Sequence, residues 1–248
     1  MHFAHFLVDV WHWLTAGAQW HGGDGVPHLL ANHVRISISS LLVAMLIAVP
    51  IGAWLGHRGV GGVVAINIAN VGRAIPIYAL LVLAVQIFGI TSPTGFGWTG
   101  SFVAFVPLVL LGIPPMVTNS YIGVRDVGEE LVDAARGMGL SEGEILRRVE
   151  IPVALPFIMA GIRTAMVGII ATATLASFTG VDTLATPIYI GLGTNDHVAV
   201  FGGAVLVALL AVVVDLVLAG VQRSIVSPGL GTGRAGRRRA MEPVPQAA

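Results

Sequence analysis

Long, mostly apolar stretches set the first limit on how this chain can fold. A helix needs about 20 mostly apolar residues to cross the core of a bilayer, and five stretches reach or approach that length. They are Val34–Leu55, Ile75–Ile90, Phe102–Tyr121, Pro156–Phe178 and Val198–Val221. Of the 248 residues, 55% are hydrophobic and only 10% are charged, which no soluble domain of this length matches. The sequence therefore predicts an all-α integral membrane protein with about five transmembrane helices.

The stretch 59–90 can be divided in two ways. It is too long for one simple span, and it is interrupted at Arg73-Ala74-Ile75-Pro76. Either it forms two short helices, or Val63–Gly72 is an amphipathic lead-in at the membrane surface and Ile75–Ile90 crosses the membrane. We favour the second arrangement, because with five spans nearly all arginines outside the spans lie on one side. Basic residues tend to stay in the cytoplasm, so the N-terminus is expected outside and the C-terminus inside.

The predicted transmembrane domain covers residues 31–223, and the two ends of the chain lie outside it. Residues 1–30 are expected to form an interfacial amphipathic helix, rich in tryptophan, followed by a Gly/Pro linker over Gly22–Pro27. Between the last two spans, Thr179–His197 is expected to be a polar connection. The tail 224–248 is rich in Gly, Pro and Arg, so it is expected to be disordered and cytoplasmic.

The stretch Gly128–Pro156 holds about a third of the chain's 26 charged residues. Read at helical period, its apolar residues form one narrow stripe, which consists of Leu131, Ala134, Ala135 and Met138. The acidic residues lie off this stripe in the first turns, where the helix dipole favours them. The pattern predicts a short helix with one face of small and apolar side chains.

Local signals divide this stretch into two helices. Asp126 is expected to cap the first helix and Gly139 to end it. A capping box at Ser141 then opens a second helix, Glu142–Val149, which Pro152 should end. Two such helices can form in any large loop for its own solubility, or the small-residue stripe can sit in a groove of another protein. The pattern alone leaves both possibilities open.

The same stretch resembles the cytoplasmic coupling loop of ABC importer permeases. In that family an acidic residue precedes two alanines, a glycine lies one turn further on, and an aliphatic-x-aliphatic-proline ending closes the loop. Here those places are taken by Asp133-Ala134-Ala135, Gly139 and Val149-x-Ile151-Pro152. Asp133 stands where Glu is usual, Val149 stands for Ile, and Ile151 for Leu. The resemblance implies that the coupling loop, residues 126–152 and including Glu130, meets a separate ATPase.

With this loop, the five-span core over about Ala31–Arg223 resembles the minimal type I ABC importer permease. Within that family the chain is most similar to the osmoprotectant group, whose solutes include glycine betaine, choline, carnitine and proline-like compounds. That likeness is carried by Asn67–Asn70 with Arg73–Pro76, Ala134–Gly139, Leu155–Ala165 and Thr194–Asp196. Methionine-type amino-acid permeases share much of the pattern and are the alternative. Gly180–Pro187 replaces a Gly-rich turn that family members often carry after the fourth span.

Composition excludes several other functions. The chain has no Lys, so it holds no phosphate-binding loop of the form GxxxxGK[ST], and no catalysis is expected in it. It has no Cys, so disulfides and thiolate metal sites are impossible, and no metal site is predicted. A secondary transporter or channel would show inverted repeats or a ring of acidic residues within the membrane, and neither is visible. A structural scaffold stays open at this point.

The resemblance also implies partners. ATP with its Mg²⁺ would bind a separate ATPase subunit, present in two copies, while this chain would hold no cofactor. Five spans make half of a transporter, so a second permease copy or a paralogue would complete it. An extracytoplasmic substrate-binding protein would deliver the solute. The chain would lie in the inner membrane in contact with lipid, and no nucleic acid partner is expected.

Two ionisable residues, Arg163 and Asp215, lie within predicted spans. Both are roughly 10–12 Å inside the cytoplasmic boundary at about 1.5 Å per residue, and charges within a membrane usually pair or line a cavity. Either the two form a bridge near an inner gate, or Arg163 reaches back to the cytosol and Asp215 sits in a local polar patch. The other predicted pathway residues are Arg73, Asn119, Tyr121, Phe178 and Tyr189. The aromatic residues are included because aromatic rings hold quaternary ammonium groups, although such residues also face lipid or fill cores.

Overall fold

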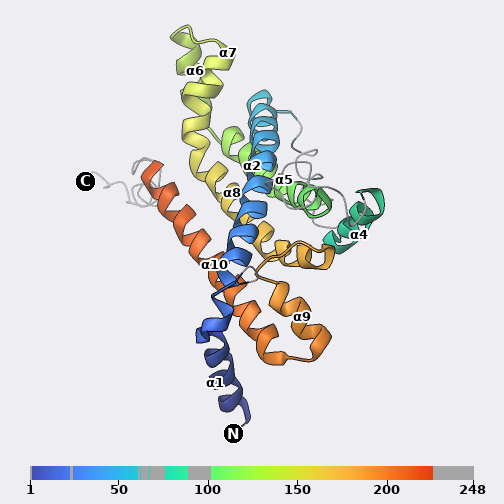
Figure 1. Ribbon diagram of the computed structural model, residues 1–248. Coiled ribbons are helices and arrows are strands. Elements are labelled where there is room, and N and C mark those ends of the chain that lie inside the picture. Colours follow the sequence, from blue (N-terminus) through green and yellow to red (C-terminus); the bar gives the residue numbers. More distant parts are fainter. Residues whose placement is uncertain are drawn as a thin grey trace, which may run out of the picture.

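The computed structural model describes residues 2–22, 25–60, 62, 67, 76–88 and 102–225. Within these residues every regular element is a helix (Figure 1). The α-helices are α1 (His2–Thr15), α2 (Val26–Arg58), α4 (Ile77–Phe88), α5 (Phe102–Arg125), α6 (Glu129–Gly137), α7 (Glu142–Ile145), α8 (Ile151–Ala173), α9 (Thr186–Thr194) and α10 (His197–Ile225). Turns of 3₁₀ helix cover Gly17–Gln19 and Thr174–Thr179, and a π-helical turn covers Leu146–Glu150. The predicted all-α class is confirmed for this part of the chain.

Four helical stretches among the described residues are long and apolar enough to cross a membrane, so the chain is a multi-pass membrane protein. They are Val26–Arg58, Phe102–Arg125, Glu142–Thr179 and His197–Ile225, and they match four of the predicted spans. The remaining predicted span, Ile75–Ile90, contains α4. This helix has 12 residues, fewer than the about 20 that a bilayer core requires. Apart from Asn67, the predicted lead-in Val63–Gly72 lies outside the described residues. The path of 59–90 and the orientation of the chain therefore stay predictions.

Helices α2, α5 and α8 form the centre of the bundle, and glycines set how closely they approach. A Cβ on Gly52 would lie 2.5 Å from the carbonyl oxygen of Val117, and one on Gly56 would also meet the backbone of α5. α2 therefore crosses α5 backbone against backbone. In α8, a Cβ on Gly161 would lie 2.8 Å from the Cβ of Asn119 on α5. Small residues let membrane helices approach in this way.

Prolines do not end these helices. The prediction that Pro152 ends the second helix of the coupling loop is wrong, because the chain continues as one helical stretch from Glu142 to Thr179. A proline ring crowds the carbonyl group four residues earlier. Directly before Pro152 the helix widens into the π-helical turn Leu146–Glu150, which gives the ring more room. Three prolines likewise lie inside α5 without ending it.

Helix boundaries differ from the prediction at two other places. α2 begins at Val26, so the end of the predicted linker and the predicted start of the transmembrane domain both fall inside a helix. Pro27 stands in the first turn of α2, where its fixed φ favours a helix start. The predicted polar connection Thr179–His197 contains α9, because Pro187 favours a helix start in the same way. Asn195, with a φ of 58°, ends α9.

α1 packs against α10. The rings of Phe6 and Phe201 meet edge-on with their centroids 5.5 Å apart, and Gly202 leaves no room for a Cβ beside the ring of Trp13. The opposite side of α1 is open to the surroundings, since Phe3 is 72% exposed. α1 thus carries a second apolar face, and its role at the membrane surface stays a prediction.

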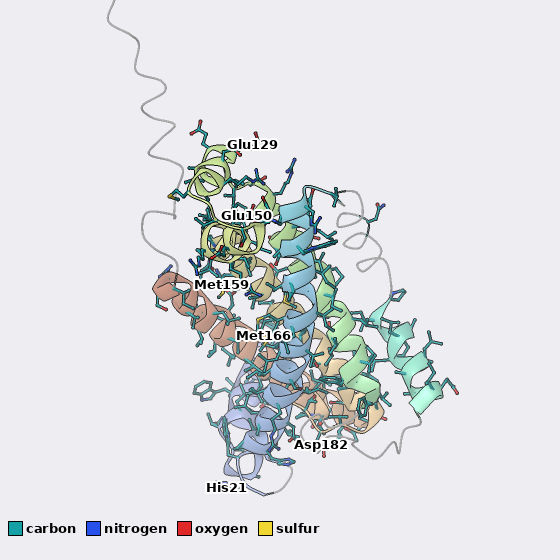
Figure 2. The ribbon with its side chains drawn as sticks, turned by 90° about the horizontal axis from the view of Figure 1, so that it is seen from above. His21, Glu129, Glu150, Met159, Met166 and Asp182 are labelled. Carbon is teal, nitrogen blue, oxygen red and sulfur yellow. The ribbon has the colours of Figure 1, made fainter. Side chains whose placement is uncertain are left out.

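Charged and polar residues lie toward both ends of the molecule, and the apolar core lies between them (Figure 2). Figure 2 shows Glu129 and Glu150 toward one end, His21 and Asp182 toward the other, and Met166 between them. Met166 is 4% exposed, in the core that α8 shares with α2 and α5. This is the arrangement expected of a chain that crosses a bilayer, with the loop 126–152 and the α8–α9 connection on opposite sides.

Candidate functional site

The coupling loop follows α5 and stands at one end of the molecule (Figure 1). Its first helix, α6, begins at Glu129 with Gly128 as N-cap, and no side chain caps it. The predicted cap at Asp126 is therefore wrong. The backbone N–H of Asp126 still bonds to the carbonyl oxygen of Ile122, so this residue prolongs the end of α5 and is not placed to cap the next helix.

Gly139 terminates α6 as the sequence predicts. Its φ of +85° lies in the left-handed region that favours glycine. Its N–H donates to the carbonyl oxygen of Arg136 at 2.9 Å, and the N–H of Leu140 donates to that of Ala135 at 3.2 Å. These two hydrogen bonds close a glycine-terminated helix and turn the chain sharply toward α7.

The predicted capping box of the second helix is confirmed. The backbone N–H and Oγ of Ser141 donate to Oε2 of Glu144 at 3.1 and 2.8 Å. These hydrogen bonds, the backbone one foremost, hold the pKa of Glu144 below its ordinary value. The second helix does not stop at Val149, because α7 continues through the π-helical turn into α8. The second half of the coupling loop is therefore the end of a membrane-crossing helix.

The predicted apolar stripe of α6 divides into an inner and an outer part. Ala135 is 2% exposed and packs on the rest of the chain. Leu131 and Met138 are 53% and 73% exposed, and Ala134 is exposed beside them. We call Leu131, Ala134 and Met138 the outer face of α6. It is an apolar surface that the described part of the chain does not cover.

The other predicted coupling residues are distributed between the surface and the base of the loop. Glu130 and Asp133 are exposed on α6. Val149 and Ile151 are half-buried, and Pro152 is exposed, where the loop enters α8. The acidic residues are thus available to a partner near the outer face of α6, whereas the aliphatic-x-aliphatic segment holds the loop to the bundle.

An ion cluster joins α6 to α7. Arg136 donates through Nε and Nη2 to the two oxygens of Glu142 at 2.9 and 3.2 Å, and through Nη1 to Asp133 at 3.2 Å. The hydrogen bond between Arg136 and Glu142 is the main cause that raises the pKa of Arg136 and lowers that of Glu142. The three side chains are exposed to solvent, so the cluster orients the two helices more than it stabilises the fold.

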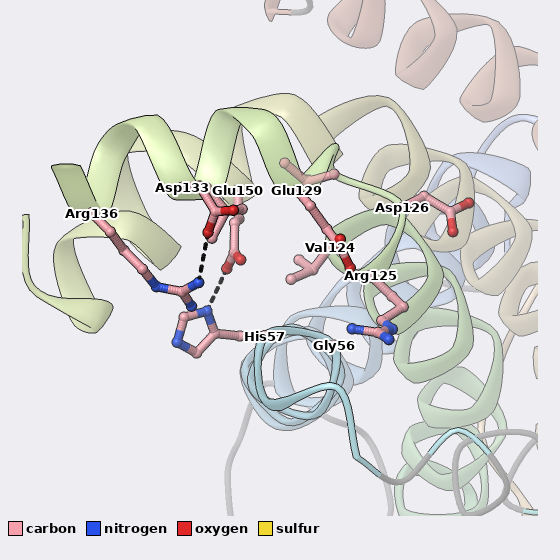
Figure 3. A pocket seen from close by; sticks show the side chains of 11 residues that line it. Gly56, His57, Val124, Arg125, Asp126, Glu129, Asp133, Arg136 and Glu150 are labelled. Atoms are coloured by element: carbon pink, nitrogen blue, oxygen red, sulfur yellow. Dashed lines mark hydrogen bonds and ion pairs between the residues drawn. The ribbon is translucent and has the colours of Figure 1, made fainter.

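His57, at the end of α2, lies against this cluster, and sequence reasoning missed it. Its Nδ1 is 2.6 Å from Oε2 of Glu150, and its Nε2 is 3.3 Å from Oε2 of Glu142. The side chains of His57 and Glu150 are only 9% and 6% exposed. Figure 3 shows the two meeting where the end of α2 approaches the loop, beside a pocket of about 480 Å³ that Arg125 and Asp126 also line. Ninety-three positions separate the partners, so no local pattern could have paired them.

The predicted bridge between Arg163 and Asp215 is present. Nε and Nη2 of the guanidinium lie 3.0 and 2.9 Å from Oδ1, and Nη2 also lies 2.9 Å from Oδ2. Nη1 donates to Oε1 of Gln222 at 3.2 Å. The pair joins α8 to α10 and faces a groove of about 550 Å³ between them. The alternative, an unpaired Arg163 that reaches the cytosol, is wrong, whereas a gating role stays a prediction.

The remaining predicted pathway residues lie on several elements. Asn119 donates to a carbonyl oxygen of its own helix at 2.7 Å, and Tyr121 packs against the core. Phe178 and Tyr189 meet edge-on with ring centroids 5.0 Å apart, and each is about half exposed. Arg73 lies outside the described residues. Of the predicted aromatic residues, only Phe178 and Tyr189 are seen in contact with each other.

The turn Gly180–Pro187 is organised by hydroxyl groups. Oγ of Ser177 lies 2.8 Å from Oγ1 of Thr183, and the N–H of Thr183 donates to Oγ1 of Thr186 at 3.0 Å. Gly180 has a φ of +80°. Side-chain hydrogen bonds thus order a turn that contains a single glycine.

The described residues thus form a helical membrane bundle with a two-helix loop at one end. Residues 48–227 match the family described as the binding-protein-dependent transport system inner membrane component. The chain belongs to this family.

Several transport permease proteins are similar to this chain over most of its length. The choline transport system permease protein OpuBB of Bacillus subtilis is 34% identical over 219 residues, which cover 88% of this chain and 96% of that one. The glycine betaine/carnitine/choline transport system permease protein OpuCB of the same organism is 34% identical over 212 residues, covering 86% and 93%. The osmoprotectant import permease protein OsmY of Salmonella typhimurium is 34% identical over 194 residues, covering 77% and 78%.

A solved structure shares the fold. The MetNI methionine ABC transporter in an inward-facing conformation matches with a TM-score of 0.67 over 82% of this chain and 96% of the chain compared. At 19% sequence identity this likeness shows the fold alone. It supports the predicted type I ABC permease core.

Proposed function

We propose that this chain is the permease subunit of an ATP-driven ABC importer in the inner membrane, and that its solute is a small osmoprotectant such as glycine betaine, choline or carnitine. The observation that carries the transport role is the capped coupling loop with its uncovered outer face of α6. The solute class is supported by the names of relatives that are 34% identical over most of the chain.

The proposal requires a separate ATPase, present in two copies, that binds ATP and Mg²⁺. Leu131, Ala134 and Met138 would enter a groove on that subunit, since Ala134 permits close approach and the two larger side chains fill apolar space. Glu130 and Asp133 flank this face as exposed charges. A second permease copy or a paralogue completes the pathway, and an extracytoplasmic binding protein delivers the solute.

Closure of the ATPase would move the coupling loop, and the helices joined to the loop would follow. α7 continues into α8 without a flexible linker, so displacement of the loop is passed directly along α8. α5 enters the loop at Asp126, and α8 leaves it at Ile151. Relative motion of these two helices would open the pathway alternately to the two sides of the membrane.

Within the bundle, the Arg163–Asp215 bridge is proposed as part of an inner gate. It connects α8, which moves with the coupling loop, to α10. On the other side of the bundle, Phe178 and Tyr189 form an exposed aromatic pair, and aromatic faces attract quaternary ammonium groups. Solute specificity resides mainly in the separate binding protein, because few aromatic side chains line the described helices.

Uptake of labelled glycine betaine and labelled methionine by cells that carry the complete transport system tests the solute class. We expect ATP-dependent uptake of glycine betaine. Uptake of methionine alone would replace the osmoprotectant assignment by an amino-acid importer, and uptake without ATP would favour a secondary transporter.

Gly139→Asp tests the coupling loop in the same assay. A Cβ at Gly139 meets no atom within 4 Å, so the change acts through the left-handed backbone and the added charge at the docking surface, not through a clash. We expect normal amounts in the membrane and at least about a tenfold loss of solute-stimulated ATPase activity. Gly139→Asn, which tolerates the same backbone without the charge, is the control and should lose less. Unchanged stimulation in Gly139→Asp would contradict the role of the loop.

A further inference from the structure

The end of α2 is bound to the coupling loop although no short segment connects them. His57 is the penultimate residue of α2, and it contacts the loop on two sides. Through Nδ1 it meets Glu150, in the turn that leads into α8. Through Nε2 it meets Glu142, the first residue of α7, which Arg136 of α6 also holds. One imidazole ring thus links the end of α2 to two points of the coupling loop.

Both ring nitrogens of His57 face carboxylate oxygens. Nδ1 is hydrogen-bonded to Oε2 of Glu150 at 2.6 Å, and Nε2 lies 3.3 Å from Oε2 of Glu142. Glu150 is 4% exposed, and a carboxylate buried to that degree needs a charged or hydrogen-bonded partner. The hydrogen bond from His57 is therefore the partner that the buried Glu150 requires within the fold.

The end of α2 that carries this link cannot slide freely. Gly56, the neighbour of His57, leaves no room for a Cβ against the backbone of α5, and Gly52 does the same one turn earlier. The end of α2 is therefore held between α5 on one side and the coupling loop on the other. A displacement of the loop would act on α2 through His57. The close contact of α2 with α5 would keep the end of α2 from bending away from the loop.

We propose that His57 is a positioning residue that carries the motion of the coupling loop into α2. The inference rests on the proposed function, because it concerns how an ATPase would drive the membrane helices. Under this proposal, three spans follow the loop: α5 and α8, which the loop joins covalently, and α2, which the loop contacts through the buried hydrogen bond between His57 and Glu150.

The test uses the complete transporter in proteoliposomes and measures solute moved per ATP hydrolysed, with assembly and basal ATPase activity recorded for each variant. We expect His57→Gln and Glu150→Gln each to lower this ratio at least about fivefold, because each leaves a buried partner unpaired. The double variant should return to within about twofold of the wild type, since two amides can bond to each other with no charge left over. His28→Gln, at the exposed opposite end of α2, is the control and should leave the ratio unchanged.

Several outcomes would overturn the link. A normal ratio in both single variants, or a double variant as poor as the two single losses combined, shows that the pair does not transmit motion. Losses of assembly that parallel the losses of coupling show a structural role only. If His57→Gln does not assemble, Glu150→Gln tests the same contact from the other side, and a ratio that falls less than about twofold in that variant overturns the proposal. A wild-type transporter that moves no solute with ATP refutes the proposed function itself, and this link with it.

Discussion

Replacing Asp215 with Asn would leave Arg163 as an unpaired charge in a membrane-crossing part of the bundle. The native pair makes three contacts of 2.9 to 3.0 Å, and a hydrogen bond to a charged group contributes about 1.5–3 kcal/mol net. The side chains are 31% and 36% exposed, so the lower part of that range applies. We expect Asp215→Asn to reduce the free energy of unfolding by about 2 kcal/mol, or about 30-fold in the ratio of folded to unfolded chain.

A double-mutant cycle isolates the pair from other effects of each substitution. Arg163→Gln should cost about as much as Asp215→Asn, because it leaves the carboxylate alone. The two together should cost about 2 kcal/mol instead of about 4, since no charge is left unpaired. Exchanging the charges, with Arg163→Asp and Asp215→Arg, should recover part of the loss. Equilibrium unfolding of the purified chain in mixed micelles, followed by circular dichroism, gives each value.

An exposed ion pair on the coupling loop provides the control. Arg148 and Glu144 lie 3.5 Å apart with side chains 71% and 44% exposed, so their coupling energy should stay below about 0.5 kcal/mol. The reasoning is refuted if Arg163→Gln and Asp215→Asn add within about 0.5 kcal/mol. It is also refuted if the exchanged pair is no more stable than the worse single variant.

Gly52→Ala should destabilise the chain by about 1–3 kcal/mol, because the new Cβ would lie 2.5 Å from the carbonyl oxygen of Val117. Thermal unfolding measures this, and Gly220→Ala, whose Cβ meets nothing within 4 Å, should not destabilise; equal effects would contradict the packing argument. Acid should loosen α6 and α7: the pKa of Glu142 is lowered mainly by its hydrogen bond to Arg136, so its contribution is present above the ordinary carboxyl pKa and is lost as pH falls through the lowered one. Hydrogen exchange of both helices, corrected for intrinsic rates, should rise in the wild type as pH falls below the ordinary carboxyl range and much less in Glu142→Gln; equal rises would refute this.

The structural features that depend only on residues close together in the sequence could be predicted. Apolar length located four membrane-crossing helices, and the roles of Gly139 and Ser141 followed from local capping chemistry. The bridge between Arg163 and Asp215 was predictable for a different reason. Charges are rare inside spans, so two of opposite sign at similar depth have few other partners.

Features that depend on distant contacts or on helix continuity were not predictable. Pro152 is a strong local stop signal, but the helix continues past it through the π-helical turn Leu146–Glu150. Asp126 has the composition of a cap, yet its backbone still belongs to α5. The contact of His57 with Glu150 joins residues 93 positions apart, and neither lies in a pattern that indicates the other.

The helix that runs unbroken from Glu142 to Ala173 has a mechanical consequence. Its combined length is about 48 Å at 1.5 Å per residue. A pivot at one tip that changes its tilt by about 10° would sweep the opposite tip through about 8 Å. A small rotation of the loop end would therefore displace the far end of the helix sideways by a large distance, and no part of the helix would have to unfold.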